Sequence, residues 1–498
     1  MSLRAACPLS TLNLSPVPLL DLFENYAGSF LDLDSGEAWD GSRLRAGRDE
    51  LCQELQRLGV ADGQRILLAV GNGAGFAISL IAVLSAGACP ILLHFETPPD
   101  ELKRLAAAYG ASFALSESWS EAEMGPVSIR ATSLELDNNA RLTCASMDDG
   151  ESQAERPFPS VSSVPLHPTS GTTGTPKIAI RHGEAAVAEA RHYQQTIGVT
   201  SEDTLLCTVP MSHAYGFGAC VTMPLVSGAS VVSTRRFQPH VIIRALKEQA
   251  ITTFPAVPAM LHLLLVAARG PIAGLPKRVL SAGAPLSEQT AKAFLEHTGQ
   301  PVQSLYGSTE TGGIAVDVNP PGVGIVGCVG PAMEPVSVEI RPLDEPGELR
   351  KGVGRVRVKS PSMMAGYLTR DGIDSSRLVD GWFETGDLGF LDEVGRIHLV
   401  GRESEVINVF GLKVIPSEVE AVLMHAPGVT DVKVYAGQHR SGSQIVKAAV
   451  AGPASLDVAA IREYCARQLV GYKRPEVITR LNSLPRTTTG KIIRDQLP

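Results

Sequence analysis

The chain has 498 residues, more than one hydrophobic core normally holds, so we expect more than one domain. Hydrophobic residues make up 44% and charged residues 19% of the chain, a balance that excludes an intrinsically disordered protein. A net charge of -8 without a basic run argues against a nucleic-acid-binding surface.

Three features bear on cellular location. The eight cysteines are scattered without the paired spacing of metal sites, which favours reduced thiols in a reducing compartment. The uncharged stretch 66–93 is interrupted by four glycines and Pro90, so it indicates strand, helix and strand rather than a membrane span. The N-terminal residues lack the long apolar stretch of an export signal. We therefore expect a cytoplasmic protein.

Short apolar runs alternate with longer helical patterns through the first 250 residues. The runs predict strands at 66–70, 90–93, 205–209 and 230–233, and the patterns predict helices at 50–58, 75–86 and 239–250. This alternation indicates parallel sheets flanked by helices. The polar segment 138–164 has no period and leads us to expect an exposed connection.

The apolar period changes to two between about residues 326 and 399. Segments 336–340 and 356–360 alternate apolar and polar residues, which predicts a small antiparallel barrel or sheet. The chain then becomes a short α+β unit, with helices expected at 417–424 and 456–469 and strands at 431–435 and 445–451. We predict an α/β domain of residues 1–401, made of two α/β sheet subdomains and a small barrel-like part, followed by an α+β domain of residues 402–498.

The loop from Pro168 to Lys177, Pro-Thr-Ser-Gly-Thr-Thr-Gly-Thr-Pro-Lys, is built to hold an anion. Its glycines let backbone N–H groups approach closely, its hydroxyls add donors, and Lys177 supplies a positive charge. It differs from the Walker loop because Thr175 and Pro176 separate the last glycine from the lysine. A polyphosphate is therefore expected here, with a chemistry other than that of Walker enzymes.

Four further segments carry clustered chemical groups. Tyr306-Gly-Ser-Thr-Glu310 places an aromatic ring, two hydroxyls and a carboxylate within five residues, and a hard dication on phosphates needs one or two such carboxylates. Asp387 ends Trp-Phe-Glu-Thr-Gly-Asp. The other two segments are 401–420, which begins Gly-Arg-Glu-Ser-Glu, and 484–491, which reads Leu-Pro-Arg-Thr-Thr-Thr-Gly-Lys.

Together the five segments resemble the adenylate-forming superfamily of acyl-CoA synthetases, aryl-CoA ligases, luciferases and adenylation domains, over residues 20–491. The resemblance implies a two-step ligation. A carboxylic acid attacks the α-phosphate of ATP in the presence of Mg²⁺, giving an acyl-adenylate and pyrophosphate. A thiol, that of CoA or of a carrier-protein phosphopantetheine, then takes the acyl group.

The resemblance also implies roles for residues of the large domain. Glu310 holds Mg²⁺, Thr309 bonds the α-phosphate, Tyr306 stacks on adenine beside Gly307 and Ser308, and Asp387 and Arg402 contact the ribose. The phosphate-binding residues are Thr169, Ser170, Gly171, Thr172, Thr173, Gly174 and Lys177. Gly283, Ala284 and Pro285 line the adenine site.

Residues of the small domain and the acid pocket follow from the same resemblance. Lys491 is the catalytic lysine that neutralises charge during adenylation, and Ser404 stands at the hinge. Gly411 lets a pantetheine arm pass, Lys413 contacts the cofactor, and His213 meets the carboxylate of the acid. Asn408 departs from the pattern, because many CoA ligases have lysine there and a lost cation could weaken binding of the adenylate or the thiol.

The acid is bounded by the pocket residues. No Asp or Glu occurs between Asp203 and Glu248, so a substrate ammonium has no obvious partner there, and a fatty or aryl acid with an uncharged tail is favoured over an amino acid. Small residues leave room for a bulky tail, although glycines also serve tight turns. They are Ala214, Gly216, Gly218, Gly307, Gly312 and Gly313.

Two alternative functions stay open. In the first, the acyl group passes to a carrier protein or the reaction stops at the adenylate, and Asn408 in place of lysine keeps this alternative open. A non-catalytic acyl or nucleotide sensor with the same fold is disfavoured because Lys177, Glu310, Asp387 and Lys491 are all present. Nothing in the chain argues for light emission.

Overall fold

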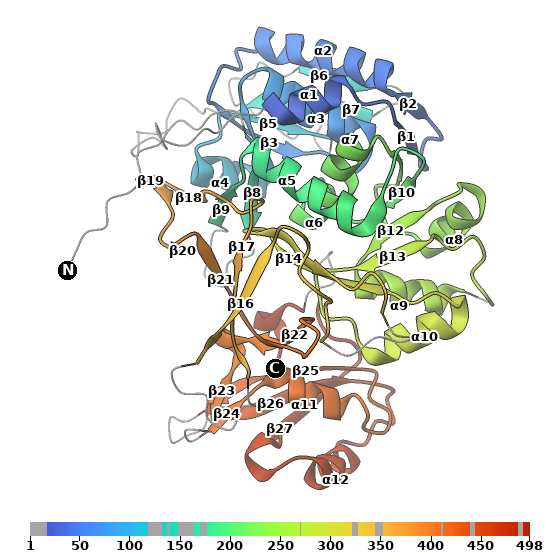
Figure 1. The fold of residues 1–498 in the computed structure, drawn as a ribbon, viewed down its shortest axis with the longest axis vertical. Coiled ribbons are helices and arrows are strands. Elements are labelled where there is room, and N and C mark those ends of the chain that lie inside the picture. Colours follow the sequence, from blue (N-terminus) through green and yellow to red (C-terminus); the bar gives the residue numbers. More distant parts are fainter. Residues whose placement is uncertain are drawn as a thin grey trace.

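The structure is a computed structural model of the chain. It describes residues 17–117, 132–136, 140–147, 164–169, 177–268, 270–320, 327–343, 352–409, 412–438, 444–486 and 492–498. The described residues form two large sheets, a five-stranded sheet and two small sheets, and the C-terminal part of the chain lies at the opposite end of the long axis from the N-terminal helices (Figure 1). No helix within these ranges has both the length and the apolar character needed to cross a bilayer.

The first large sheet has nine strands in the order β19-β18-β9-β8-β4-β3-β5-β7-β6. Its centre is parallel and its two sides are antiparallel. The strands are β3 Arg65–Ala69, β4 Cys89–Leu92, β5 Phe113–Ser116, β6 Thr132–Leu136, β7 Ala140–Ser146, β8 Leu166–Thr169, β9 Lys177–Ile180, β18 Gly366–Thr369 and β19 Gly372–Asp374.

The second large sheet has eight strands in the order β15-β14-β13-β12-β10-β11-β1-β2, and only its two end pairs are antiparallel. The strands are β1 Ser29–Asp32, β2 Ala38–Asp40, β10 Thr204–Cys207, β11 Ser230–Ser233, β12 Thr253–Ala256, β13 Arg278–Ser281, β14 Gln303–Ser308 and β15 Gly312–Val316. Ligands of open parallel sheets bind beyond the carboxyl ends of the strands.

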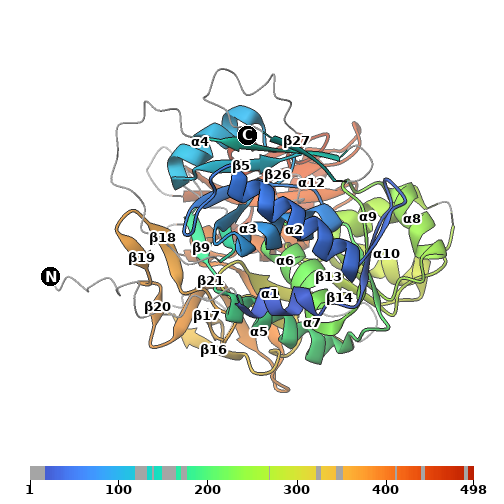
Figure 2. The ribbon, with the colours of Figure 1, turned by 90° about the horizontal axis from the view of Figure 1, so that it is seen from above.

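Helices cover these sheets, and α3 is buried over almost its whole length because it is apolar on every side. Seen from above, α1, α2 and α3 lie together (Figure 2). The helices are α1 Val17–Glu24, α2 Gly41–Arg57, α3 Ala74–Ser85, α4 Pro99–Tyr109, α5 Gly183–Tyr193, α6 Ala214–Phe217, α7 Met223–Ser227, α8 Pro239–Glu248, α9 Pro258–Ala267 and α10 Glu288–Thr298.

The alternating strands and helices expected from the sequence are present, with shifted ends. The helix expected at 50–58 begins at Gly41, because the Asp40 side chain caps it by accepting from Arg43 N. The expectation of an exposed connection at 138–164 is wrong for β7, whose Leu142 and Cys144 are fully buried beside β5. Two strands of the period-two region, β18 and β19, extend the nine-stranded sheet instead of a barrel.

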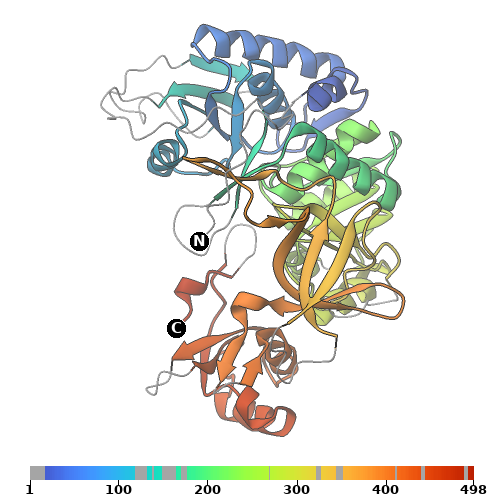
Figure 3. The ribbon, with the colours of Figure 1, turned by 60° about the vertical axis from the view of Figure 1, so that its left-hand side comes forward.

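The remaining period-two residues form the five-stranded antiparallel sheet, which lies between the large sheets and the C-terminal part (Figure 3). Its strands are β16 Ser337–Pro342, β17 Gly354–Lys359, β20 Leu378–Val379, β21 Trp382–Leu391 and β22 Ile397–Arg402. The C-terminal part contains β23 Ile407–Val409, β24 Leu412–Val414, α11 Pro416–Leu423, β25 Asp431–Gln438, β26 Gln444–Ala451, α12 Val458–Gln468 and β27 Val477–Leu481.

A buried ion pair connects the two large sheets. Arg181, which follows β9, places Nη2 2.6 Å from Oε2 of Glu189 on α5, and both side chains are almost completely buried. The other oxygen of Glu189 accepts the N–H of Gly313 in β15 at 3.0 Å. One carboxylate therefore fixes the end of β9 against the edge strand β15 of the other sheet.

Glycines leave the space that this carboxylate occupies. A Cβ added at Gly218 or Gly312 would lie 2.9 Å from the Glu189 carboxyl carbon, and one at Gly313 would lie 2.6 Å from Cε1 of Tyr193. Gly312 also has a φ of +70°, which favours glycine. The small residues here are therefore explained by close packing on α5.

We expect Gly313→Ala to lower the free energy of unfolding by about 1–3 kcal/mol, because the new methyl group overpacks against Tyr193. Urea denaturation measures this change. Gly270→Ala is the matched control, since a Cβ there meets nothing within 4 Å and should change stability by less than about 0.5 kcal/mol. Equal effects of the two substitutions would contradict the close-packing explanation.

Candidate active site

The phosphate loop is presented by an antiparallel hairpin at the edge of the nine-stranded sheet's parallel core. Thr169 ends β8, Lys177 begins β9, and the two residues are paired, with Thr169 Oγ1 donating to the Lys177 carbonyl at 3.2 Å. The predicted contacts Ser170, Gly171, Thr172, Thr173 and Gly174 lie outside the described residues. The hairpin fixes the two ends of the loop, and it leaves the Lys177 side chain exposed.

Asp387 on β21 gathers two other predicted site residues. The Tyr306 hydroxyl at the end of β14 donates to Oδ2 of Asp387 at 2.5 Å, and the Arg402 guanidinium on β22 lies 2.8 Å from Oδ1. Asp387 and Arg402 are also direct partners in the pairing of β21 with β22. Three motifs that are separate in the sequence therefore meet at one carboxylate.

Burial dominates the electrostatics of this cluster. It raises the pKa of Asp387 above the ordinary value for aspartate, although Arg402 and the Tyr306 hydroxyl both favour the ionised form. Burial and the neighbouring Asp387 carboxylate raise the pKa of Tyr306, so this phenol stays a neutral donor. Asp387 N also donates to Thr385 Oγ1, which fixes the backbone before the carboxylate.

Glu310 and its neighbours occupy the tight turn between β14 and β15. Ser308 Oγ accepts from Thr311 N at 3.2 Å and closes the turn, while Thr309 and Glu310 are partly exposed at its tip. Oε1 of Glu310 accepts the hydroxyl of Tyr367 on β18 at 2.7 Å. The Lys177 Nζ lies 5.0 Å from the centroid of the same Tyr367 ring, so the predicted metal ligand and the predicted phosphate lysine face one side chain.

The other predicted large-domain residues follow the carboxyl ends of parallel strands. Gly283, Ala284 and Pro285 come directly after β13, and Gly283 has a φ of +82°. His213 and Ala214 begin α6, downstream of β10, and His213 is exposed. Both segments therefore lie at the sheet edge where parallel α/β proteins bind ligands.

The predicted pocket glycines face protein atoms rather than open space. A Cβ at Gly216 would lie 2.1 Å from the Pro210 carbonyl oxygen, and one at Gly307 would lie 2.6 Å from that of Gly312. Gly218, Gly312 and Gly313 pack on Glu189 and Tyr193, as described above. These glycines therefore do not carry the inference of a roomy pocket for the acid.

Residues of the small domain are placed in part. Ser404 is central in the single 3₁₀ turn Glu403–Glu405, Lys413 lies on β24, and Asn408 is exposed on β23. Gly411 and Lys491 lie outside the described residues.

Sequence reasoning missed Glu189 and Tyr367. Glu189 lies before the interval from Asp203 to Glu248 that lacks acidic residues, on a helix that the motifs do not include. Tyr367 is 57 residues from Glu310, and neither its neighbours nor its spacing marks it as more than a buried strand residue. Only the order of strands in the sheets brings Glu189 to Gly313 and Tyr367 to Glu310.

The described residues contain no group of three or more His, Cys, Asp or Glu side chains that could hold a metal ion alone. A single carboxylate fits Mg²⁺ that arrives with nucleotide phosphates, since such Mg²⁺ uses one or two protein carboxylates. Glu310, the predicted ligand, would supply this carboxylate, and both it and Lys177 contact Tyr367.

We expect Asp387→Asn to gain stability relative to the native protein as the pH rises through the acid range. The pKa of Asp387 is raised in the fold, so its contribution is greatest below the ordinary aspartate pKa of about 3.9 and is lost as the pH rises through the folded pKa. Asparagine keeps an acceptor for Tyr306 and does not ionise. Urea denaturation of both proteins between about pH 4 and pH 7 tests this, and a difference that moves in the opposite direction would mean that the Arg402 ion pair outweighs burial.

Comparison with known proteins agrees with this geometry. A family model described as "AMP-binding enzyme" matches residues 29–368, and one described as "AMP-binding enzyme C-terminal domain" matches residues 418–491. The 2-succinylbenzoate–CoA ligase of Enterococcus faecalis is 33% identical over 355 residues, covering 70% of this chain and 71% of that protein. The peroxisomal OPC-8:0-CoA ligase 1 of Arabidopsis thaliana is 27% identical over 498 residues, covering 94% and 90%.

Solved structures share the fold over almost the whole chain. The O-succinylbenzoate coenzyme A synthetase of Bacillus subtilis, solved with ATP and magnesium ion, has a TM-score of 0.80 at 23% identity, covering 96% of this chain and 98% of that one. The amide bond synthetase McbA of Marinactinospora thermotolerans has a TM-score of 0.79 at 25% identity, covering 97% and 98%. The match of one family model to more than half of the chain and the similarity to the Enterococcus ligase show that this protein belongs to the AMP-binding enzymes, the adenylate-forming family that its motifs resemble.

Proposed function

We propose that this enzyme is an ATP-dependent acid–CoA ligase, which joins a carboxylic acid to AMP with release of pyrophosphate and then transfers the acyl group to CoA. The two curated relatives described above are CoA ligases. The observation that carries the proposal is the contact of Tyr306 and Arg402 with Asp387, because it brings three nucleotide-binding motifs to one place.

The nucleotide binds across the edges of the two large sheets. Asp387 accepts the ribose hydroxyls, and Tyr306, held by its hydroxyl, offers its ring to adenine beside Gly283, Ala284 and Pro285. The phosphates extend toward the β8–β9 hairpin, where Lys177 supplies a positive charge and Thr169 a hydroxyl.

Glu310 would hold Mg²⁺ together with the phosphates, since its Oε1 is fixed by Tyr367 at the tip of the β14–β15 turn. When bound, the ion neutralises phosphate charge and polarises the phosphoryl oxygens. Positioning and charge stabilisation supply most of the catalysis in such transfers.

The reaction has two steps, adenylation of the acid and transfer of the acyl group to the thiol. An oxygen of the substrate carboxylate, met by His213, forms a bond to the α-phosphorus, and the bond to pyrophosphate breaks. Lys491 neutralises the charge that develops between the carboxylate and the α-phosphate. The thiol then bonds to the acyl carbon, AMP leaves with the electron pair of the broken C–O bond, and the thiol proton is released.

Ser404 is the hinge between the two steps, and ion pairs on its two sides support this role. Before it, Arg402 pairs with Asp387 and Glu403 pairs with Arg355 of β17 at 2.9 Å, both in the large domain. After it, Glu405 pairs with Lys433 of β25 at 3.3 Å and with Arg494 near the C-terminus. Rotation about residue 404 therefore leaves each set of ion pairs intact within its own domain.

The acid is a fatty or aryl acid rather than an amino acid. Glu189 is the acidic side chain that packs against Gly312 and Gly313, but its two oxygens are already bonded to Arg181 and to Gly313 N–H. It therefore offers no free carboxylate to a substrate ammonium, and pairing with an ammonium would break a buried ion pair.

An ATP–pyrophosphate exchange screen across fatty, aryl and amino acids tests the proposal. We expect exchange with one or more fatty or aryl acids whose tails are uncharged and none with amino acids. Cleavage of ATP only to ADP and phosphate with every acid would overturn the proposed reaction. Acyl transfer measured with CoA and with holo carrier proteins separates the CoA ligase from the carrier-loading alternative, which the exposed Asn408 in place of lysine keeps in play.

We expect Lys491→Ala to slow adenylation by about 100-fold or more, because it removes the charge that stabilises the transition state. Thioester formation from supplied acyl-adenylate should be largely unchanged, since the hinge has by then withdrawn this residue. Stopped assays of the two half-reactions measure both effects. Lys292→Ala, an exposed lysine of α10, is the control, and an equal loss in both half-reactions of Lys491→Ala would contradict domain alternation.

A further inference from the structure

The segment 362–367 is hydrogen-bonded to the turn that carries Glu310. Ser362 Oγ donates to the Thr311 carbonyl at 2.7 Å, and Met364 N donates to the Glu310 carbonyl at 2.7 Å. Tyr367 then donates its hydroxyl to Oε1 of Glu310, also at 2.7 Å. Three hydrogen bonds therefore hold both the backbone and the side chain of this turn.

The same segment is fixed to the strand that carries Lys177. β18 pairs antiparallel with β9, with Tyr367 opposite Ala179, and Ala365 N donates to the Ile180 carbonyl at 2.8 Å. Side chains two residues apart share a face of a strand, so Tyr367 lies diagonally across from Lys177 on one face. This register explains the 5.0 Å distance between Lys177 Nζ and the Tyr367 ring centroid.

Tyr367 is suited to both contacts. Its side chain is largely buried, with 6% of the residue exposed. Burial, together with the neighbouring Glu310 carboxylate, raises the pKa of its phenol, so the hydroxyl stays a donor throughout the working pH range. The ring presents an electron-rich face to the ammonium of Lys177. Asp374 of β19 is the direct partner of Tyr367 in the sheet. Hydrogen bonds from Ser376 lower the pKa of Asp374, and the positive charge of Lys177 lowers it further.

We propose that Tyr367 is a positioning residue for adenylation: its hydroxyl orients Glu310 toward Mg²⁺, and its ring orients Lys177 toward the phosphates. The inference rests on the proposed function. A carboxylate held at one oxygen keeps a single orientation, and the second oxygen is then directed without a reorganisation cost when the ion arrives with ATP. The two halves of the role are carried by different atoms of one side chain, so they can be separated by substitution.

Tyr367→Phe removes only the hydroxyl and keeps the ring. We expect the Mg²⁺ concentration at half-saturation to rise about fivefold or more in pyrophosphate exchange, as for the loss of a hydrogen bond to a charged group, with little change in the KM of the acid. Tyr367→Leu also removes the ring, and we expect it to raise the KM for ATP in addition. A purely structural tyrosine would lower stability and kcat without moving the Mg²⁺ dependence.

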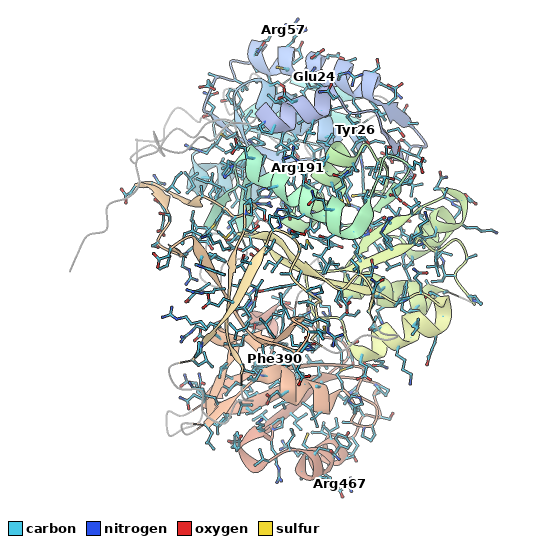
Figure 4. All side chains as sticks on the ribbon, viewed as in Figure 1. Glu24, Tyr26, Arg57, Arg191, Phe390 and Arg467 are labelled. Carbon is cyan, nitrogen blue, oxygen red and sulfur yellow. The ribbon has the colours of Figure 1, made fainter. Side chains whose placement is uncertain are left out.

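Tyr26→Phe is the matched control. Tyr26 lies just after α1 in the N-terminal part of the chain, and its hydroxyl, also buried, donates to the Ala229 carbonyl at 2.7 Å (Figure 4). The Tyr26→Phe substitution removes a buried phenol hydroxyl, as Tyr367→Phe does, but at a position away from the motif residues. We expect the Mg²⁺ titration of this variant to match that of the native protein.

Calorimetric titration of ATP at graded Mg²⁺ concentrations gives a readout that needs no acid. An unchanged or lower Mg²⁺ requirement in Tyr367→Phe, relative to both the native protein and Tyr26→Phe, would overturn the inference while leaving the proposed ligase reaction intact. Absence of exchange with every acid would instead count against the proposed function, and the binding titration would still decide the role of Tyr367. A double-mutant cycle with Glu310→Gln should show that the effect of Tyr367→Phe disappears once the carboxylate is gone.

Discussion

The ion pair between Arg181 and Glu189 is the interaction on which the arrangement of the site depends. Arg181 follows β9 of the nine-stranded sheet and bonds one oxygen of Glu189, and the second oxygen of Glu189 holds β15, the edge strand of the eight-stranded sheet, through a backbone N–H. Removal of one partner of a buried pair leaves an uncompensated charge and typically costs about 3–5 kcal/mol. The relative position of the two sheets is therefore determined by groups with little freedom to adjust.

That relative position matters because each sheet contributes one half of the site. The nine-stranded sheet presents Lys177 through the β8–β9 hairpin, and the eight-stranded sheet presents Tyr306 and Glu310 at the end of β14. Strand β18 crosses from the period-two region to join the first sheet, and its segment also bonds to the turn of the second. The five-stranded sheet adds Asp387 and leads through β22 directly to the hinge. Strands therefore carry the groups proposed to bind ATP, and one short turn is proposed to carry the motion.

Local patterns predicted most of the large domain because buried strands leave short apolar runs in the sequence. The run at 230–233 coincides with β11, and the predicted strand at 445–451 is within one residue of β26. β7 was missed because its buried residues are flanked by polar segments. The resemblance implied that Asp387 and Arg402 both contact the ribose, which stays a prediction, and the structure joins the two side chains in an ion pair. Glu189 and Tyr367 could not be predicted, because their partners lie 124 and 57 residues away and only the order of strands brings them together.

The two protein donors on Asp387 bear on how a bound nucleotide would affect the proposed hinge. Each of its oxygens accepts from one protein donor, so about half of its four lone-pair positions are taken and a ribose in the proposed position competes with Tyr306 and Arg402 for the carboxylate. The two donors differ in how easily their bonds to Asp387 break. The Tyr306 phenol is buried, whereas 54% of the Arg402 side chain is exposed, so water can solvate its guanidinium once it is released. Arg402 is the donor that would yield to a ribose, and it stands two residues before Ser404, the proposed hinge. A ribose in that position would therefore free a guanidinium on the large-domain side of the proposed pivot, while the ion pairs that follow Ser404 stay within the small domain.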